Sequence, residues 1–121
     1  MIAVLKGPVE GRGRFARQLH GRPHFADIVL QLIPAASDDI NIRNHSALAM
    51  VQDYFHAISD ALRVLSGSMP FRIYCDVVLT GGIELLSDAS ELAYREAAVA
   101  AFQDAVEKGM KSGQIVLKED E

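Results

Sequence analysis

The residues best suited to chemistry in this sequence are arginines near its start. Residues 1–24 hold five cations and one anion, a formal charge of +4, whereas the rest of the chain holds seven cations and fifteen anions, a charge of −8. Planar guanidinium groups fit phosphate oxygens better than ammonium groups do. Four of the five cations are arginines, namely Arg12, Arg14, Arg17 and Arg22. The cluster indicates an anionic partner, and the alternative is a solvated basic edge that discourages aggregation between strands.

The same segment holds side chains that could ligate a metal. His20, His24 and Asp27 could in principle converge on a zinc ion. However, a His-x-x-x-His pair needs a helix to bring both rings to one side, and Gly21 and Pro23 disfavour a helix here. We therefore expect no metal site and no cofactor.

The sequence lacks the motifs of the common enzyme classes. No Gly-Lys-Ser/Thr triplet occurs, so the phosphate-binding loop of nucleotide hydrolases is absent. No Gly-x-Ser-x-Gly motif occurs, and Cys75 lies in a predicted strand without a positioned base, as a buried core residue would. A single cysteine excludes an intramolecular disulfide and fits a reducing compartment. We therefore expect a cytoplasmic, non-enzymatic protein that binds no nucleotide.

Length and composition are typical of one folded domain. The chain has 121 residues, of which 50% are hydrophobic and 23% charged, so it can bury a core without disulfides or metals. Nowhere do 18 uncharged apolar residues run together, so we expect no transmembrane helix and no membrane partner. The expected organisation is a single domain over residues 1–121.

A basic hairpin is the element that must position the arginines. Val9–Leu19 alternates loosely between small or apolar and charged residues, which predicts a strand. Gly21–Pro23 predicts a turn, and the apolar run Phe25–Ile33 predicts the second strand. The arginines then lie along the first strand and at the tip of a hairpin over residues 9–33.

A helix and a strand follow the hairpin. Over residues 46–66, apolar residues recur at alternating three- and four-residue steps, which predicts one face of a helix. Asn44 or Ser46 can cap its start, and Gly67 suits the left-handed position past its end. A β-branched and aromatic run predicts a strand over residues 71–80.

A second helix and a short strand complete the predicted fold. Asp88 and Glu91 have the spacing of a capping box, which predicts a helix over residues 89–108 stopped by Gly109. Gln114–Leu117 predicts a last strand. The expected fold is α+β, with a four-stranded sheet and two helices on one of its faces.

Two separated stretches carry a family resemblance. The first runs Val9-Glu10-Gly11-Arg12, then Arg17-Gln18-Leu19-His20-Gly21-Arg22-Pro23-His24-Phe25. The second runs from Gly82 through Asp88-Ala89-Ser90-Glu91-Leu92-Ala93-Tyr94-Arg95. In this order they resemble motifs of domain IV of the ribosomal translocase, which is bacterial elongation factor G and its archaeal and eukaryotic counterpart, elongation factor 2. The similar region spans about residues 4–118.

The resemblance implies a fold and a function. The implied fold is that of the second domain of ribosomal protein S five, with a left-handed βαβ crossover. In the full factor, two tip loops of domain IV enter the decoding centre of the small ribosomal subunit, and here they match Leu19–Phe25 and Gly82–Ser87. We therefore expect a stand-alone, non-catalytic, translation-factor-like module that contacts the small subunit or other structured RNA. The implied RNA-binding residues are Arg12, Arg14, Arg17, His20, Gly21, Arg22, His24 and Phe25.

Departures from the family define the alternatives. The GTPase domain and the other domains of the factor lie outside this sequence, so any GTPase activity would belong to them. Leu85 stands where the family's second tip loop usually carries a histidine, and an apolar pair with Leu86 in a loop is typical of an interface. One alternative is therefore a protein-interaction module that pairs with itself or with another chain. The other is a fragment of a full elongation factor.

Overall fold

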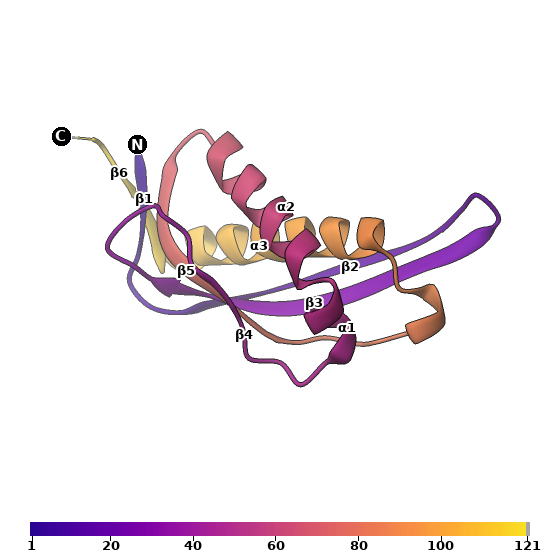
Figure 1. The fold of residues 1–121 in the computed structure, drawn as a ribbon. Coiled ribbons are helices and arrows are strands. Elements are labelled where there is room, and N and C mark those ends of the chain that lie inside the picture. The colour runs from indigo at the N-terminus through magenta and orange to yellow at the C-terminus, as the bar shows by residue number, and fades with distance from the viewer. Residues whose placement is uncertain (121) are drawn as a thin grey trace.

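The computed structural model describes residues 1–120 and shows an α+β fold, in which three α-helices accompany one curled, mixed sheet (Figure 1). The α+β class expected from the sequence is confirmed. The helices are α1 (Ala49–Asp53), α2 (Phe55–Ser68) and α3 (Glu91–Ser112), with a short 3-10 turn, η1 (Leu86–Asp88). The strands are β1 (Ile2–Leu5), β2 (Val9–Leu19), β3 (Arg22–Pro34), β4 (Ile42–Asn44), β5 (Arg72–Gly81) and β6 (Ile115–Lys118).

The sheet has six strands where the sequence predicts four. Its order is β2-β3-β5-β1-β6, and β4 pairs with β5 off this path. β5 and β6 confirm the strands predicted over residues 71–80 and Gln114–Leu117. The prediction of four strands is wrong because β1 and β4 are only four and three residues long. Both pair in parallel with the distant β5, which no local pattern reports.

The hairpin turns at His20 and Gly21. Both residues have positive φ angles, 53° and 78°, as the type I′ turn that joins two strands through two residues requires. In the resulting register, Pro23 pairs with Gln18 at a non-hydrogen-bonded position of the ladder. The missing N–H of proline therefore costs no hydrogen bond between the strands. The strand therefore begins at Arg22, and the predictions of a turn over Gly21–Pro23 and of a strand start at Phe25 are wrong.

Glycines in β2 let that strand lie directly on the backbone of α3. A Cβ atom added at Gly13 would overlap the carbonyl oxygen of Ala97, and one added at Gly11 would overlap that of Ala101. Both alanines are fully buried. Only glycine lets a strand approach a helix this closely. α2 packs in turn on α3 and β5.

The helix predicted over residues 46–66 is present but interrupted. α1 and α2 are separated at Tyr54, whose φ of −103° and ψ of 13° lie outside the helical region. The Tyr54 ring stacks on that of Tyr94 in α3, with 5.1 Å between centroids. The predicted apolar face is confirmed, because Val51, Ile58 and Leu62 are fully buried.

Both ends of this helical region differ from the prediction. Neither Asn44 nor Ser46 caps α1, because Leu48 occupies the N-cap position. The Glu84 carboxylate instead accepts a hydrogen bond of 2.6 Å from the N–H of Met50. At the other end, α2 continues to Ser68, two residues beyond the predicted end, so the prediction that Gly67 lies in the left-handed position past the helix is wrong.

The cap and stop of α3 also lie elsewhere. Ser90, and not Asp88, is the N-cap, and its hydroxyl oxygen accepts a backbone N–H of the first helical turn. The helix ends at Gly113, whose φ of 80° gives the left-handed cap. Gly109 was predicted to stop the helix, but it lies inside it. There it makes room for the side chain of Ile115, with which a Cβ atom would overlap.

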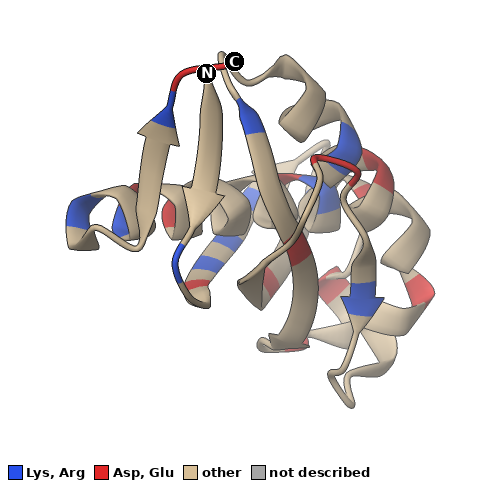
Figure 2. Cartoon of the chain, turned by 90° about the vertical axis from the view of Figure 1, so that its left-hand side faces the viewer, with Lys and Arg blue, Asp and Glu red and all other residues tan. Residues whose placement is uncertain are grey.

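The two ends of the molecule differ in character. The β2–β3 hairpin projects past the helices at one end, and both chain termini lie at the other (Figure 1). Figure 2 looks onto the end with the termini, where positive and negative residues are mixed. Over residues 1–120, no helix is long and apolar enough to cross a membrane.

Candidate nucleic-acid interface

The hairpin presents two faces, and the predicted arginines are divided between them. Residues opposite each other in a ladder share a face. The face that points away from α3 holds Arg12 and Arg14, with Phe25 and Asp27 on the partner strand. The face that points toward α3 carries Arg17, Leu19, Arg22 and His24.

On the first face, two of the predicted RNA-binding arginines are paired with a buried carboxylate. Asp27 is fully buried, whereas the side chains of Arg12 and Arg14 are about half exposed. Arg12 Nη2 lies 3.0 Å from Asp27 Oδ1, and Arg14 Nε lies 2.9 Å from Asp27 Oδ2. Arg12 Nε donates to the same carboxylate at 3.1 Å. Asp27 thus offsets one of the two positive charges.

Two of the predicted RNA-binding residues, Phe25 and His24, already have partners within the fold. Phe25 lies beneath Arg14, with the guanidinium carbon 5.5 Å from the ring centroid. His24 Nδ1 lies 2.8 Å from the Ser90 hydroxyl oxygen, so its ring joins the hairpin to the first turn of α3. Both side chains are half-buried. Their contacts position the hairpin and leave less of each ring free for a ligand.

The end of the hairpin holds the remaining predicted residues, all exposed. Arg17 and Arg22 form no ion pair and no side-chain hydrogen bond within residues 1–120. His20 and Gly21 form the turn between them. Arg17 lies over Phe15, with 5.5 Å from the guanidinium carbon to the ring centroid. The structure therefore brings together the cations of the tip, separately from the pair bound to Asp27.

A groove beside these cations was not predicted from the sequence. It lies between the distal half of β2 and the first turns of α3, with a volume of about 330 Å³. Its lining consists of Arg14, Phe15, Arg17, Leu19, Leu92, Glu96 and Ala100. Arg14, although paired with Asp27, therefore also borders the groove. The helix residues lie more than 70 positions from the strand residues, so no local spacing could join them.

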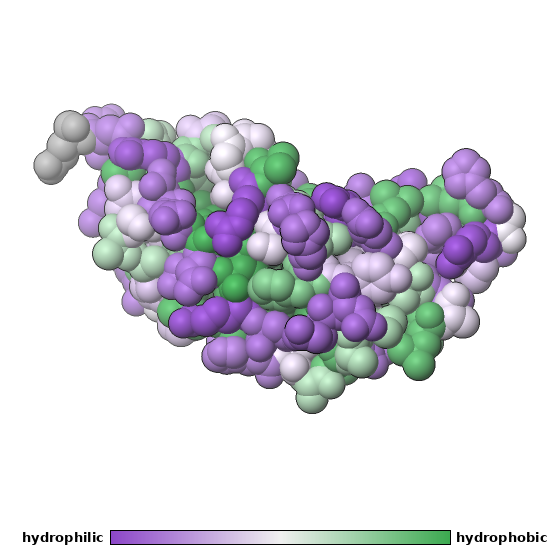
Figure 3. All heavy atoms as spheres, in the orientation of Figure 1, coloured by the Kyte–Doolittle hydropathy of each residue, from purple (hydrophilic) through white to green (hydrophobic). Residues whose placement is uncertain are grey.

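The apolar pair Leu85 and Leu86 lies at the surface, as the interface alternative requires. Their exposed fractions are 44% and 67%, and nearby Ile83 is 42% exposed. In the space-filling view, apolar residues gather where the η1 segment lies in Figure 1 (Figure 3). Exposed apolar residues that cluster in this way mark a candidate contact surface.

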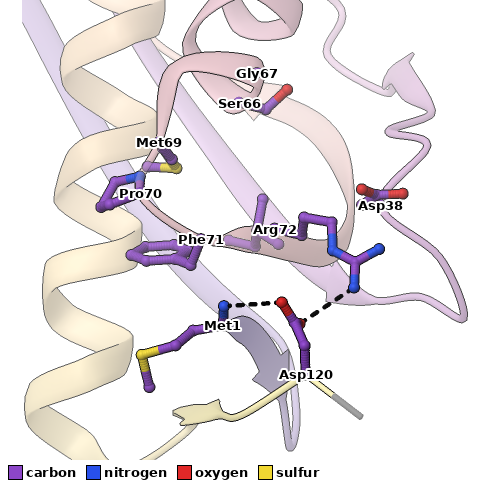
Figure 4. A pocket seen from close by; sticks show the side chains of 10 residues that line it. Met1, Asp38, Ser66, Gly67, Met69, Pro70, Phe71, Arg72 and Asp120 are labelled. Atoms are coloured by element: carbon purple, nitrogen blue, oxygen red, sulfur yellow. Dashed lines mark hydrogen bonds and ion pairs between the residues drawn. The ribbon is translucent and has the colours of Figure 1, made fainter.

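A hollow of about 440 Å³ lies at the opposite end, between the termini (Figure 4). Three of its charged groups are paired with each other, and Asp38 also lines it. The Met1 ammonium and the Arg72 guanidinium each lie 3.2 Å from the Asp120 carboxylate. These contacts fasten the ends of the chain together, away from the predicted site.

The candidate metal ligands and the candidate nucleophile are held within the fold. Across residues 1–120, no three His, Cys, Asp or Glu side chains are grouped as metal ligands would be. Asp27 is held by the two arginines, and the His24 ring by Ser90. Cys75 is fully buried, as predicted for a core residue. Burial, with a smaller contribution from Asp76, raises the pKa of its thiol to about 12, so the nucleophilic thiolate is disfavoured.

Comparisons with known proteins support the fold. No protein-family model and no curated protein matches the chain. Among solved structures, it is similar to part of a crystal structure of a protein from Thermus thermophilus, with a TM-score of 0.71 and 24% sequence identity over 87% of this chain. The match covers 16% of the Thermus chain. At this identity, the similarity establishes a shared fold.

Proposed function

We propose that this chain is a non-catalytic module, similar to domain IV of elongation factor G, that binds structured RNA through the end of its β2–β3 hairpin. The observation that carries the proposal is that Arg17 and Arg22 are exposed on a projecting hairpin and have no ion pair within residues 1–120. The small ribosomal subunit is the proposed partner. The finer fold proposed with it is that of the second domain of ribosomal protein S five, with a left-handed βαβ crossover.

The proposal gives the hairpin residues different roles. Arg17 and Arg22 bind phosphate oxygens, because their guanidinium groups are free to form paired hydrogen bonds. The His20 ring and the Gly21 backbone, both at the turn, offer hydrogen bonds to bases or sugars. Arg12 and Arg14, which are paired with Asp27, contribute a weaker positive electrostatic potential to the hairpin. The module acts in the cytoplasm and needs no nucleotide of its own.

Replacing both tip arginines by alanine should weaken RNA binding and reduce its salt dependence. Each lost phosphate contact lowers the slope of log affinity against log salt by about 0.7–0.9, so the double substitution Arg17→Ala/Arg22→Ala should flatten it by about 1.5. The measurement is co-sedimentation of the purified chain with small ribosomal subunits over a salt series.

A matched control removes two cations elsewhere. Arg43 and Lys118 are exposed on β4 and β6 and form no ion pair within residues 1–120. Arg43→Ala/Lys118→Ala therefore changes the net charge by the same amount but leaves the tip intact. For this variant, the slope of log affinity against log salt should stay within about 0.5 of that of the original chain. Equal flattening in both double variants, or no saturable binding at low salt, would contradict the proposal.

A second candidate function is self-association through Leu85 and Leu86, which the 44% and 67% exposure of these side chains favours. On this reading, the exposed apolar residues of the segment pair with those of a second copy. Leu85→Asp should then convert a concentration-dependent dimer into a monomer in sedimentation equilibrium. A chain that is monomeric at every concentration tested would exclude this candidate.

A third candidate is that the module works as part of a full elongation factor. The Thermus match supports only the first part of this candidate, a module within a longer protein, because there the shared fold occupies 16% of the chain. Translocation and GTP hydrolysis would then belong to the whole protein. The mass of the native protein and its reading frame distinguish this candidate from a stand-alone module.

A further inference from the structure

The groove between β2 and α3 adjoins the free cations of the hairpin tip. Arg17 belongs to both, since it lines the groove and lies on the same face of the hairpin as Arg22. A strand whose phosphates are bound by these two arginines would therefore pass the open side of the groove. At about 330 Å³, the groove is at the small end of the range for ligand sites, which suits one base better than a larger group.

We propose that this groove binds a single unpaired guanine base of the RNA held by the tip. The inference rests on the proposed RNA-binding function and adds a base preference to it. Two features carry it: a stacking platform on the strand side, and an unpaired carboxylate on the helix side.

The stacking platform is formed by Arg17 and Phe15. The Arg17 guanidinium carbon lies 5.5 Å from the centroid of the Phe15 ring, and the Arg17 side chain is exposed, so it is accessible to a ligand. Leu19 and Leu92 add apolar walls, and Leu92 is 41% exposed without a ligand. Unpaired RNA bases are commonly bound by stacking on aromatic rings and on arginine planes, and apolar side chains can cover the rest of a base.

The carboxylate of Glu96 provides the base preference. Glu96 is exposed and forms no ion pair or side-chain hydrogen bond within residues 1–120, although its neighbour Arg95 is paired with Glu91. A carboxylate only accepts hydrogen bonds, and its two oxygens match two adjacent donors. Guanine offers such a pair, N1–H and N2–H, on its Watson–Crick edge. The other three bases place at least one acceptor beside their donor, which a carboxylate repels.

The first test measures the binding of nucleoside monophosphates to the groove, without an RNA strand. In amide-resolved NMR titrations, GMP should shift the signals of Leu92, Glu96 and Ala100 at a concentration at least fivefold lower than AMP, CMP or UMP does. Glu96→Gln should reduce this preference for GMP to less than twofold. Glu10→Gln, the same change on an exposed β2 residue outside the groove, should leave it intact. No shift at these residues, or equal shifts with all four nucleotides, would overturn the inference.

The second test separates the groove from the proposed function. Octauridine with a guanine at its centre should bind at least fivefold tighter than octauridine itself in fluorescence anisotropy. Glu96→Gln should remove that preference and leave the salt slope unchanged, whereas Arg17→Ala/Arg22→Ala should lower both the affinity and the slope. Salt-dependent binding without base preference would overturn the groove inference alone. Binding of neither oligonucleotide would also overturn the groove inference, whereas the proposed binding of structured RNA is tested separately by co-sedimentation with small ribosomal subunits.

Discussion

Gly13→Ala is expected to destabilise the folded protein strongly. The added methyl group would overlap the backbone of α3 at Ala97 and at Ala101, and a backbone atom cannot move aside as the end of a flexible side chain can. The strand and helix must separate, which breaks the buried contact between β2 and α3. We expect a loss of about 3 kcal/mol or more from a total of about 5–15 kcal/mol. Urea denaturation followed by circular dichroism measures it.

The same substitution at another glycine provides the control. Gly67 lies in α2, and no atom lies within 4 Å of the Cβ position there. Gly67→Ala should therefore stabilise the protein by about 0.5–1 kcal/mol, since alanine has the higher helix propensity. If Gly13→Ala unfolds at nearly the same urea concentration as the original chain, β2 and α3 do not lie as close as described.

Removing both arginines that face Asp27 should destabilise the fold by about 3 kcal/mol. Arg12→Met/Arg14→Met keeps much of the apolar stem of each side chain but leaves a fully buried carboxylate without a cation. Breaking a buried ion pair from one side costs about 3–5 kcal/mol, and we take the lower value because both arginines are half exposed. The measurement is the free energy of unfolding in urea, and the m value, which is the dependence of that free energy on urea concentration, should not change.

A double-mutant cycle tests whether Asp27 is the cause. In an Asp27→Asn background, the same two arginine substitutions should cost less than about 1 kcal/mol, because no buried charge remains to be neutralised. Equal costs in both backgrounds would show that Arg12 and Arg14 stabilise the hairpin by packing alone. At a temperature where Arg12→Met/Arg14→Met is still folded, its RNA affinity should fall less than that of Arg17→Ala/Arg22→Ala.

Local patterns were sufficient to predict the hairpin, the long helices and the buried thiol. The apolar steps through Val51, Ile58 and Leu62 correctly identified the buried face of α1 and α2. Such patterns do not report which elements meet. Gly11 and Gly13 can be read from sequence as loosening the strand, and only the position of α3 reveals that they make a close contact possible.

The division of the arginines was hidden by a small error in the turn. A loop over Gly21–Pro23 would set Arg14 opposite Leu30, whereas the turn at His20 and Gly21 sets it opposite Asp27. Charge clustering therefore identified the basic hairpin but could not distinguish an arginine bound to a carboxylate from a free one. Glu96 could not be found at all, because the groove depends on the packing of helix against strand.

Mechanically, the hairpin is a propped beam. It is clamped where Gly11 and Gly13 meet α3, and it is supported again where His24 meets Ser90. Only a short part of the hairpin extends beyond the contact between His24 and Ser90, so the thermal displacements of its tip are small. Without the bond to Ser90, the free length would reach back to the clamp, roughly 20 Å of strand at 3.3 Å per residue. His24 thus limits the amplitude of motion at the hairpin tip, although it is not itself part of the turn.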